Sequence, residues 1–446
     1  MKGPKLLIAG AGEKLQYLAH NYNDNTIRFI IKYPSRLKED VLCAAAGALV
    51  NSVDVLHSSF VPGNLSAHWH VNQDVEPVDY FSLIETDGDP MGPAKTEALR
   101  STALEGKSQL HCTLIQGKES SVVVFLVSHL CADGTDGKYL LNKLTEAYNR
   151  ISQEGTAQGL EIKNGSRAPE KVYEELSAKE FLSLMKSPLT GVKTMFPFHT
   201  EEHSYLKMNY VLISKELFAQ ARQKAKEKGA TANDILLTAC YRSYALLDGV
   251  HENDAMSIMS MMDLRQHCKE NESLGLCNMS GSLPTLLKEG VQGTFADTLK
   301  EIVLQTKKAK EDPLAGLEGM PLLHGIVHTM PMWLMLQAAG LVYSSLSLSL
   351  TNLGNISCQE LAMDGAVPVE GIFAGPLKKK PSMQISAASF DGTPALAVVG
   401  DYTKEDALLI QSILDGMVKR NYRLYSRRKI ETNAAKSGIW RHKCLI

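Results

Sequence analysis

The order of strand-like and helix-like segments is the feature that most constrains the fold of this chain. Alternating apolar residues and short apolar runs predict strands at 25–33, 108–117, 120–127, 204–213, 255–267, 278–287 and 345–354. Apolar residues at helical spacing predict helices at 37–53, 138–151, 214–229, 231–247, 295–312 and 331–343. Because these strands and helices mix without strict one-to-one alternation, we expect an α+β fold with largely mixed sheets.

Turn and cap residues support several of these boundaries. Thr231 or Asn233 can cap the helix that follows, because both side chains accept hydrogen bonds from the first turn of a helix. Asp391 and Gly392 form a dipeptide that is typical of a tight hairpin turn. A last helix is predicted to begin at Thr403.

The composition is that of a folded globular protein, and it excludes some functions. The 446 residues span two to three typical domains or one large two-lobed unit, and 44% hydrophobic residues allow a substantial core. The formal net charge of −2 gives no field that favours nucleic acid, so no nucleic-acid partner is expected. The eight Cys are scattered without a CxxC pair, and the apolar run at 6–10 is too short for a signal peptide. We therefore expect reduced thiols and a cytoplasmic location.

One long stretch, 319–359, carries no Asp, Glu, Lys or Arg. Proline and histidine residues and a Ser-rich tail interrupt it, and no run reaches the roughly 20 apolar residues of a spanning helix. We therefore expect a buried helix followed by a strand, and no membrane span. The stretch contains methionines that can adapt to an irregular apolar ligand, although packing in the core is the simpler role: Met320, Met330, Met332 and Met335.

The clearest candidate for a catalytic motif lies at 129–134, which has the sequence His-Leu-Cys-Ala-Asp-Gly. An apolar strand delivers His129 to a loop, and a helix is predicted just beyond Gly134, a setting in which a scaffold often presents catalytic side chains. Histidine can take up a proton near neutral pH. Asp133 can orient the loop or the ring, and Gly134 permits a tight turn into the helix. A loop histidine beside a capping aspartate would give the same pattern, so the motif alone leaves catalysis open.

Three other patterns carry weaker signals. The Gly-Ala-Gly sequence at 10–12 lacks the third glycine and the preceding full strand of a nucleotide-binding loop. His324 and His328 have the spacing of two metal ligands on a helix, but no third ligand is nearby, so no metal site is expected. His68 and His70 share one face of a short strand, where a structural role is the simpler interpretation.

Several segments of the chain resemble one known family. The segment 128–134 resembles the HxxxDG active-site motif of the condensation-domain and alcohol-acetyltransferase superfamily, whose members share the chloramphenicol acetyltransferase-like fold. A helix motif at 229–237, a D-L-R segment at 262–265 and an S-N-L-G-like strand end at 350–354 follow in the family's order. The segment Val55–Phe60 also resembles a family stretch, with His57 in place of its usual arginine. Together these segments are far more specific than the single motif.

The resemblance implies two chloramphenicol acetyltransferase-like lobes, which we place at 1–185 and 186–446, with His129 in an active-site tunnel at their interface. An acyl thioester would enter from one face and an acceptor from the other. His129 would take a proton from an alcohol or amine, which attacks the thioester carbonyl directly. Because no acyl-enzyme forms in this mechanism, Cys131 is expected to be a small buried thiol and not a nucleophile.

The resemblance also suggests supporting roles for other residues. The motif aspartate of the family usually pairs with an arginine, and Arg265, close to Asp263, is the candidate partner of the aspartate here. A surface arginine at a strand end is the alternative. The Gly134 N–H and the side chains of Asn352 or Ser349 are candidate donors to the tetrahedral oxyanion.

Two basic patches are candidate sites for the phosphates of a donor such as acyl-CoA. One patch is Lys378, Lys379 and Lys380, and the other is the segment 419–443, which has nine Lys or Arg residues. A solvated face or tail is the alternative. No cofactor is expected to stay bound, because acyl-CoA or a phosphopantetheinyl carrier protein would act as a substrate.

Departures from the family narrow the expected function. The D-F-G-W-G motif of the plant branch is absent, and Ser128 occupies a place where many condensation domains have a second histidine. No carrier or adenylation domain is present in the sequence. These features favour a free-standing, monomeric acyltransferase with a small-molecule acceptor. A stand-alone condensation enzyme that uses a carrier protein, and a non-catalytic ligand-binding or partner-binding member of the fold, are the alternatives.

Overall fold

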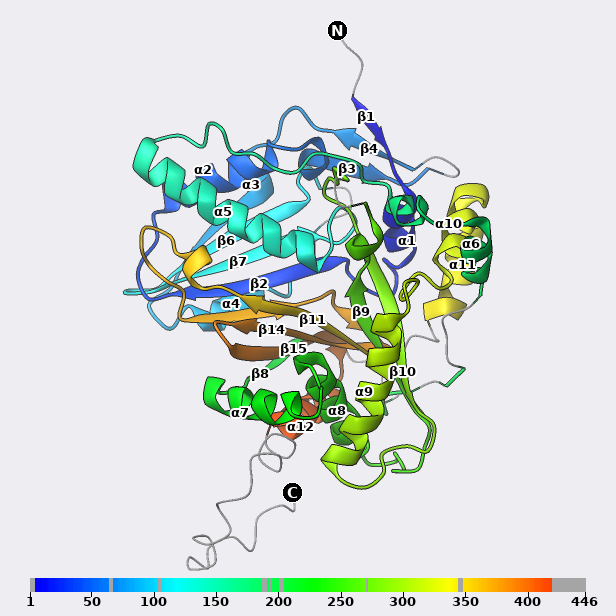
Figure 1. Ribbon diagram of the computed structural model, residues 1–446. Coiled ribbons are helices and arrows are strands. Elements are labelled where there is room, and N and C mark those ends of the chain that lie inside the picture. Colours follow the sequence, from blue (N-terminus) through cyan, green and yellow to red (C-terminus); the bar gives the residue numbers. More distant parts are fainter. Residues whose placement is uncertain are drawn as a thin grey trace, which may run out of the picture.

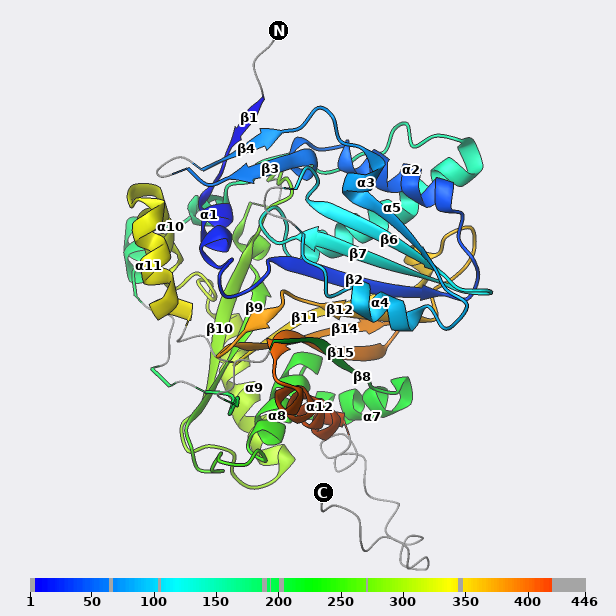
Figure 2. The same ribbon diagram turned by 180° about the vertical axis from the view of Figure 1, so that it is seen from behind.

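The computed structural model describes residues 5–63, 67–102, 106–186, 191–192, 194–199, 204–269, 272–343 and 348–418. Two large sheets lie one above the other, and most of the helices cover the sides of the sheets that face outward (Figure 1). The view from behind shows the same two layers (Figure 2). The predicted α+β class with mixed sheets is confirmed. The basic segment 419–443 lies outside the described residues.

The first large sheet holds the strand that leads to His129. Its strands are β2 (Thr26–Tyr33), β5 (Phe81–Glu85), β6 (Leu110–Gln116), β7 (Ser121–Ser128) and β12 (Glu370–Ala374). They are arranged in the order β12-β2-β7-β6-β5. β7 pairs antiparallel with β2 and β6, whereas β5 runs parallel to β6, so the sheet is mixed. β7 is buried along its whole length, as expected for a central strand with a continuous apolar run.

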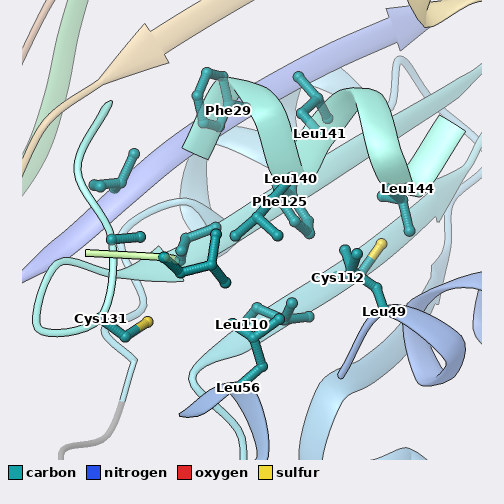
Figure 3. Close-up of a cluster of buried hydrophobic side chains, with 14 of the residues drawn as sticks. Phe29, Leu49, Leu56, Leu110, Cys112, Phe125, Cys131, Leu140, Leu141 and Leu144 are labelled. Atoms are coloured by element: carbon teal, nitrogen blue, oxygen red, sulfur yellow. The ribbon is translucent and has the colours of Figure 1, made fainter. Parts of the chain in front are cut away.

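Two helices, α2 (Glu39–Val50) and α5 (Gly134–Glu154), cover the outer face of this sheet. Their apolar side chains and those of the sheet form one buried cluster, in which Figure 3 labels Phe29, Leu49, Leu56, Leu110, Cys112, Phe125, Cys131, Leu140, Leu141 and Leu144. α5 approaches β2 closely at Gly137, where a Cβ atom would lie 3.1 Å from the Phe29 ring. This packing fixes the direction of α5, and with it the loop that holds His129.

A small sheet and several short elements surround this unit. The small sheet has the order β1-β4-β3, with β1 at Leu6–Ile8, β3 at Ser58–Val61 and β4 at His68–Val71. Gly10 is the N-cap of α1 (Ala11–Leu18), so the segment 10–12 forms the start of a helix. His68 and His70 lie half-buried on β4. The remaining elements of this region are α3 (Pro77–Tyr80), α4 (Met91–Glu97) and the 3₁₀ helix at Asp54–His57.

The second large sheet contains β8 (Tyr205–Leu212), β9 (Met256–Asp263), β10 (Ser280–Leu287), β11 (Leu348–Ile356), β13 (Lys378–Lys379), β14 (Met383–Phe390) and β15 (Thr393–Tyr402). Its order is β10-β9-β11-β14-β15-β13, and β8 also pairs with β15. β11 runs parallel to both β9 and β14, whereas β14 and β15 form the predicted hairpin. Asp391 and Gly392 have φ values of 47° and 83° in its turn, the left-handed conformation that this dipeptide favours.

Four helices, α7 (Lys215–Lys226), α8 (Ala232–Tyr244), α9 (Phe295–Glu311) and α12 (Lys404–Gly416), pack against the outer face of the second sheet. Thr231 caps α8, as predicted, and its hydroxyl accepts a hydrogen bond from the N–H of Asp234. Thr403 caps α12 in the same way. Each cap satisfies backbone groups that would otherwise lack partners and stabilises its helix by about 1 kcal/mol.

The described part of the charge-free stretch forms helices and a strand. It contains α10 (Met320–Thr329), α11 (Met332–Tyr343) and β11. In the part of the chain that the structure describes, none of the helices has the length and apolar character needed to cross a membrane. Met332 and Met335 are buried in the core of the first sheet, whereas Met330 is 37% exposed. α6 (Ala178–Ser183) and the 3₁₀ helices at Pro169–Tyr173, Leu264–His267 and Gln359–Leu361 complete the described elements.

The two halves of the sequence are joined through β12. This strand comes from the C-terminal half, but it pairs antiparallel with β2 and forms the edge of the first sheet. Phe373 of β12 stands opposite Phe29, and the centroids of their rings are 5.5 Å apart. The other faces of β2 and β7 share a second buried cluster with β12, β15 and β8. The boundary between two lobes at residue 185 stays a prediction. β12 lies after this boundary in the sequence, but it belongs to the first sheet.

Candidate functional site

His129 lies in a short loop between β7 and α5. The backbone N–H of His129 donates a hydrogen bond to the Asn25 carbonyl at 2.7 Å, which ties the loop to the start of β2. Cys131, two residues on, is fully buried, and burial raises the pKa of its thiol to about 12. A buried neutral thiol is a poor nucleophile, so the loop offers His129 as its reactive side chain.

Asp133 is buried and anchors this loop. Asp133 is the N-cap residue of α5, and its Oδ1 accepts a hydrogen bond from the backbone N–H of Asp136 at 3.0 Å. Its Oδ2 accepts from the backbone N–H of Met279 at 2.9 Å and from Arg265 Nη1 at 2.8 Å. The carboxylate therefore joins the loop to the start of β10 and to the 3₁₀ helix that follows β9. These contacts hold the loop in place.

Arg265 lies between several carboxylates. Besides Asp133 it contacts Asp263 Oδ1 at 3.0 Å and Asp136 Oδ1 at 3.0 Å, and it donates to the Cys277 carbonyl at 3.1 Å. Its side chain is only 17% exposed, so it is not a surface arginine. The planar guanidinium suits this use, because its fork of N–H groups can bind several oxygens at fixed angles.

Asp136 is a second buried carboxylate that sequence reasoning missed. It accepts a hydrogen bond from the Cys277 N–H at 2.8 Å and pairs with Lys163 as well as with Arg265. Burial and the neighbouring Asp133 raise its pKa to about 6, although Arg265 and Lys163 oppose the rise. Its place three residues after Asp133, in the first turn of the helix, was the only available signal.

The surroundings of His129 favour its neutral form. Burial lowers the pKa of the imidazole; Asp133 partly opposes this effect, and the positive charge of Lys378 adds to it. Asn278 Nδ2 lies 3.4 Å from His129 Nδ1, and Ser280 fixes the amide by donating its N–H to Asn278 Oδ1 at 3.0 Å. A histidine that is neutral at physiological pH can accept a proton from a bound ligand.

A cavity of about 350 Å³ lies in front of His129, within the size range of small-molecule sites. Its walls come from both halves of the sequence, with residues of the β7–α5 loop facing residues of β9, β10 and β11. Predicted site residues that line it are His129, Asp133, Gly134, Asp263, Ser349, Asn352 and Lys378. Arg265 is not in the lining and acts on the cavity through Asp133 and Asp263.

The rest of the lining mixes apolar and hydroxyl side chains. Several methionines face the cavity, among them Met259 and Met262 of β9 and Met320 of α10. Hydroxyl groups come from Ser280 and Ser282 of β10, which the sequence did not single out. Such a wall suits a partly apolar ligand that also carries hydrogen-bonding groups.

The candidate oxyanion donors differ in how they are placed. Asn352 Oδ1 accepts a hydrogen bond from the Gly354 N–H at 2.9 Å, which leaves the amide N–H groups for a ligand. The Ser349 hydroxyl lies 3.5 Å from the Met383 carbonyl, a weak contact that a ligand can replace. The Gly134 N–H belongs to the first turn of α5, where backbone N–H groups lack helical partners.

The three consecutive lysines are separated by the structure. Lys378 lines the cavity, whereas Lys379 is exposed. Lys380 pairs with Asp406 at 2.8 Å and donates to the His199 carbonyl at 2.7 Å, away from the cavity. The three side chains therefore do not form one phosphate site.

The paired histidines of α10 lie beside a carboxylate. His328 Nε2 is 2.8 Å from Glu170 Oε1, and His324 Nδ1 is 3.9 Å from the same oxygen. Over the described ranges of the chain, no group of three or more His, Cys, Asp or Glu side chains is placed to hold a metal ion.

Comparison with known proteins shows similarity in structure and not in sequence. No family model matches the chain, and no curated protein sequence matches it. Among the solved structures that are similar to the chain, three examples superpose over 94% of it. Polyketide synthase associated protein 5 from Mycobacterium tuberculosis has a TM-score of 0.66 at 15% identity over 98% of its own chain. The first condensation domain of the CDA synthetase has a TM-score of 0.67 at 14% identity over 96%.

The third similar structure is the trichothecene 15-O-acetyltransferase TRI3 from Fusarium sporotrichioides, with a TM-score of 0.65 at 10% identity over 95% of its chain. Each of the three matches covers nearly the full length of both chains that are compared, so the similarity extends over both large sheets. The chain therefore has the two-lobed fold of condensation domains and acetyltransferases, the chloramphenicol acetyltransferase-like fold that its motifs resemble.

Proposed function

We propose that this protein transfers an acyl group from a thioester to an alcohol or amine, with His129 as the general base. The observation that carries this proposal is the position of a neutral, half-buried histidine at a cavity lined by both halves of the chain. Asp133, which pairs with Arg265, anchors the loop that carries His129. The similarity to condensation domains and an acetyltransferase supports acyl transfer or condensation as the reaction class.

The proposed reaction needs no covalent enzyme intermediate. His129 takes the proton of the acceptor O–H or N–H as the oxygen or nitrogen attacks the thioester carbonyl. The resulting tetrahedral oxyanion needs donors that are already in place, for which we propose the Gly134 N–H and the side chain of Asn352 or Ser349. The intermediate then expels the thiolate, which receives the proton from His129. The products are an ester or amide and a free thiol.

Acyl-CoA is the donor that we propose, with a small-molecule acceptor. We further propose that the cavity is the centre of a tunnel, which donor and acceptor enter from opposite faces. A phosphopantetheinyl carrier protein is the second candidate donor, because condensation domains are among the similar structures. The free thiols of all described cysteines support a reducing compartment such as the cytoplasm.

The test is release of free thiol from a panel of acyl-CoAs, with and without pooled alcohols and amines. The wild-type protein is compared with His129→Ala and with the control His328→Ala, whose imidazole is 46% exposed and pairs with Glu170. Loss of a general base should lower the acceptor-dependent rate by about 10²–10⁴-fold. The control should keep the wild-type rate.

Each result has a clear meaning. Acceptor-dependent release that is lost in His129→Ala alone supports the proposal. Equal release of thiol from the wild type and from His129→Ala would exclude His129 as the base. No release from any acyl-CoA, followed by activity with an acylated carrier protein, would make the chain a condensation enzyme. No activity with either donor would favour a binding role.

A further inference from the structure

Lys378 is the one residue of the three-lysine run that faces the cavity of His129. The strand β13 carries it beside β15, and its backbone also bridges to Asn23. Because side chains alternate along a strand, Lys379 points outward and is exposed. Lys378 itself is half-buried and lines the same cavity of about 350 Å³ as His129.

The charged groups of the cavity wall differ in how they are paired. The two lining aspartates, Asp133 and Asp263, both pair with Arg265. The Lys378 ammonium has no hydrogen bond or ion pair with any residue that the structure describes. Asp24 is the carboxylate that acts on it electrostatically, but this group is already engaged by Arg28. A cation that is partly removed from water without a partner is costly, so its cavity is suited to a negatively charged ligand.

A second polar group on the same wall also lacks a partner. Gln384 of β14 is 9% exposed, and its Oε1 is buried without a hydrogen bond within the described part of the chain. The oxygen packs against Gly375, where a Cβ atom would lie 2.7 Å from it. Buried amide groups are normally paired, so this oxygen is an unsatisfied acceptor beside the cavity. Among the described residues, the wall at Lys378 therefore carries an unpaired cation and, beside it, an unpaired hydrogen-bond acceptor.

We propose that Lys378 binds an anionic group, a carboxylate or phosphate, of the substrate that reaches His129. The inference rests on the proposed acyl transfer and adds the chemical class of its substrate. A carboxylate of the acceptor or of the acyl group fits best, because Lys378 shares one cavity with the reacting histidine. The phosphates of coenzyme A are separated from the thioester by the whole pantetheine arm, and Lys379 and Lys380 are turned away from this cavity.

The same contact would couple substrate charge to the base. Burial lowers the pKa of Lys378 to about 8, so the side chain is a cation at neutral pH and loses its charge above that value. Its charge also helps to lower the pKa of His129. An anion on Lys378 would cancel this effect and strengthen His129 as a base once the substrate has bound.

Matched substrate pairs test the proposal and identify the source of the anion. One arm compares hydroxy acids and amino acids with their methyl esters as acceptors of acetyl-CoA. The second arm compares succinyl-CoA with butyryl-CoA as donors. The third arm compares acetyl-CoA with the acetyl thioester of N-acetylcysteamine, which has no phosphate. The proteins are wild type, Lys378→Met and the control Lys379→Met.

In one of the first two arms, the wild type should prefer the charged member in kcat/KM by about tenfold to hundredfold. Lys378→Met should lose this preference and shift the acidic limb of its pH profile to higher pH. Lys379→Met should behave like the wild type. A preference confined to the third arm would assign Lys378 to the donor phosphate. No charge preference in the wild type, or one that survives in Lys378→Met, would overturn the proposal.

A binding measurement separates this inference from the acyl-transfer proposal. Calorimetric titration of His129→Ala and of the double variant His129→Ala/Lys378→Met with the same acids and esters requires no turnover. Tighter binding of the acids that depends on Lys378 supports the anion site even if no reaction is found. Equal binding by both proteins would refute the anion site even if acyl transfer is confirmed.

Discussion

Replacing Arg265 by Met should destabilise the protein strongly at pH 8 and much less at pH 5. Arg265 makes ionic contacts of 2.8 Å to Asp133 and 3.0 Å to Asp136, and both aspartate residues are at most 2% exposed. Removing the guanidinium leaves two charges inside the protein, and Lys163 pairs only with Asp136. Hydrogen bonds to buried charged groups contribute about 1.5–3 kcal/mol each, so the loss should be about 3–5 kcal/mol at pH 8.

The pH dependence follows from the direction of the pKa shift. Burial raises the pKa of Asp136 above its ordinary value to about 6 even with Arg265 present, and the variant should raise it further. A carboxyl group with a raised folded-state pKa binds more protons in the folded than in the unfolded state. The free energy of unfolding therefore falls as the pH rises through this range and recovers as the pH is lowered. At pH 5 the variant can protonate Asp136, which removes one of the two buried negative charges.

Urea unfolding of the wild type and Arg265→Met at both pH values measures this difference. Urea is preferred because guanidinium salt would screen the charges. The control is Arg36→Met, since Arg36 is 48% exposed and its pair with Glu85 should contribute at most about 1 kcal/mol. A loss below 1 kcal/mol at pH 8, or the same loss at both pH values, would refute the view that Arg265 neutralises buried carboxylates.

Two further predictions follow from the packing and charge of the site. The acidic limb of kcat/KM should lie below pH 6.5, because burial lowers the pKa of His129 and the base must be neutral in the free enzyme; a limb above pH 6.5 would contradict this environment. Gly371→Ala should lower the free energy of unfolding by about 1–3 kcal/mol, because the new Cβ would lie 2.3 Å from the Phe390 ring. In the same thermal unfolding assay Gly92→Ala, which meets no atom within 4 Å, should be neutral or slightly stabilising.

Local sequence patterns predicted the elements around the site well. The apolar run before Ser128 became the central strand β7, and the residues from Gly134 became α5, because periodicity and capping depend on neighbours in the sequence. The hairpin turn at Asp391 and Gly392 was equally local, since two residues determine its backbone conformation.

Residues that depend on distant contacts were harder to predict. Nothing near Asp136 in the sequence indicates that Arg265 and Lys163 would surround it. Asn278 reaches His129 only because β10 lies beside the β7–α5 loop. The lysine run could be recognised as basic, but its division among a cavity, solvent and an ion pair depends on a two-residue strand.

The methionines of the charge-free stretch show the same limit. Met320 lines the cavity, whereas Met332 and Met335 pack in the core. Hydrophobic spacing indicates that such residues are buried, but it does not distinguish a core from the wall of a cavity.

The strand β12 has a consequence for how the protein is made. In the finished sheet Phe29 stands opposite Phe373, so the ribosome must add more than 300 residues before the edge of the first sheet can close. Until then β2 presents an open row of backbone N–H and C=O groups, the kind of edge that pairs with other chains. We therefore expect the nascent N-terminal half to be prone to aggregation during translation, and chaperones that shield strand edges to protect it until β12 emerges.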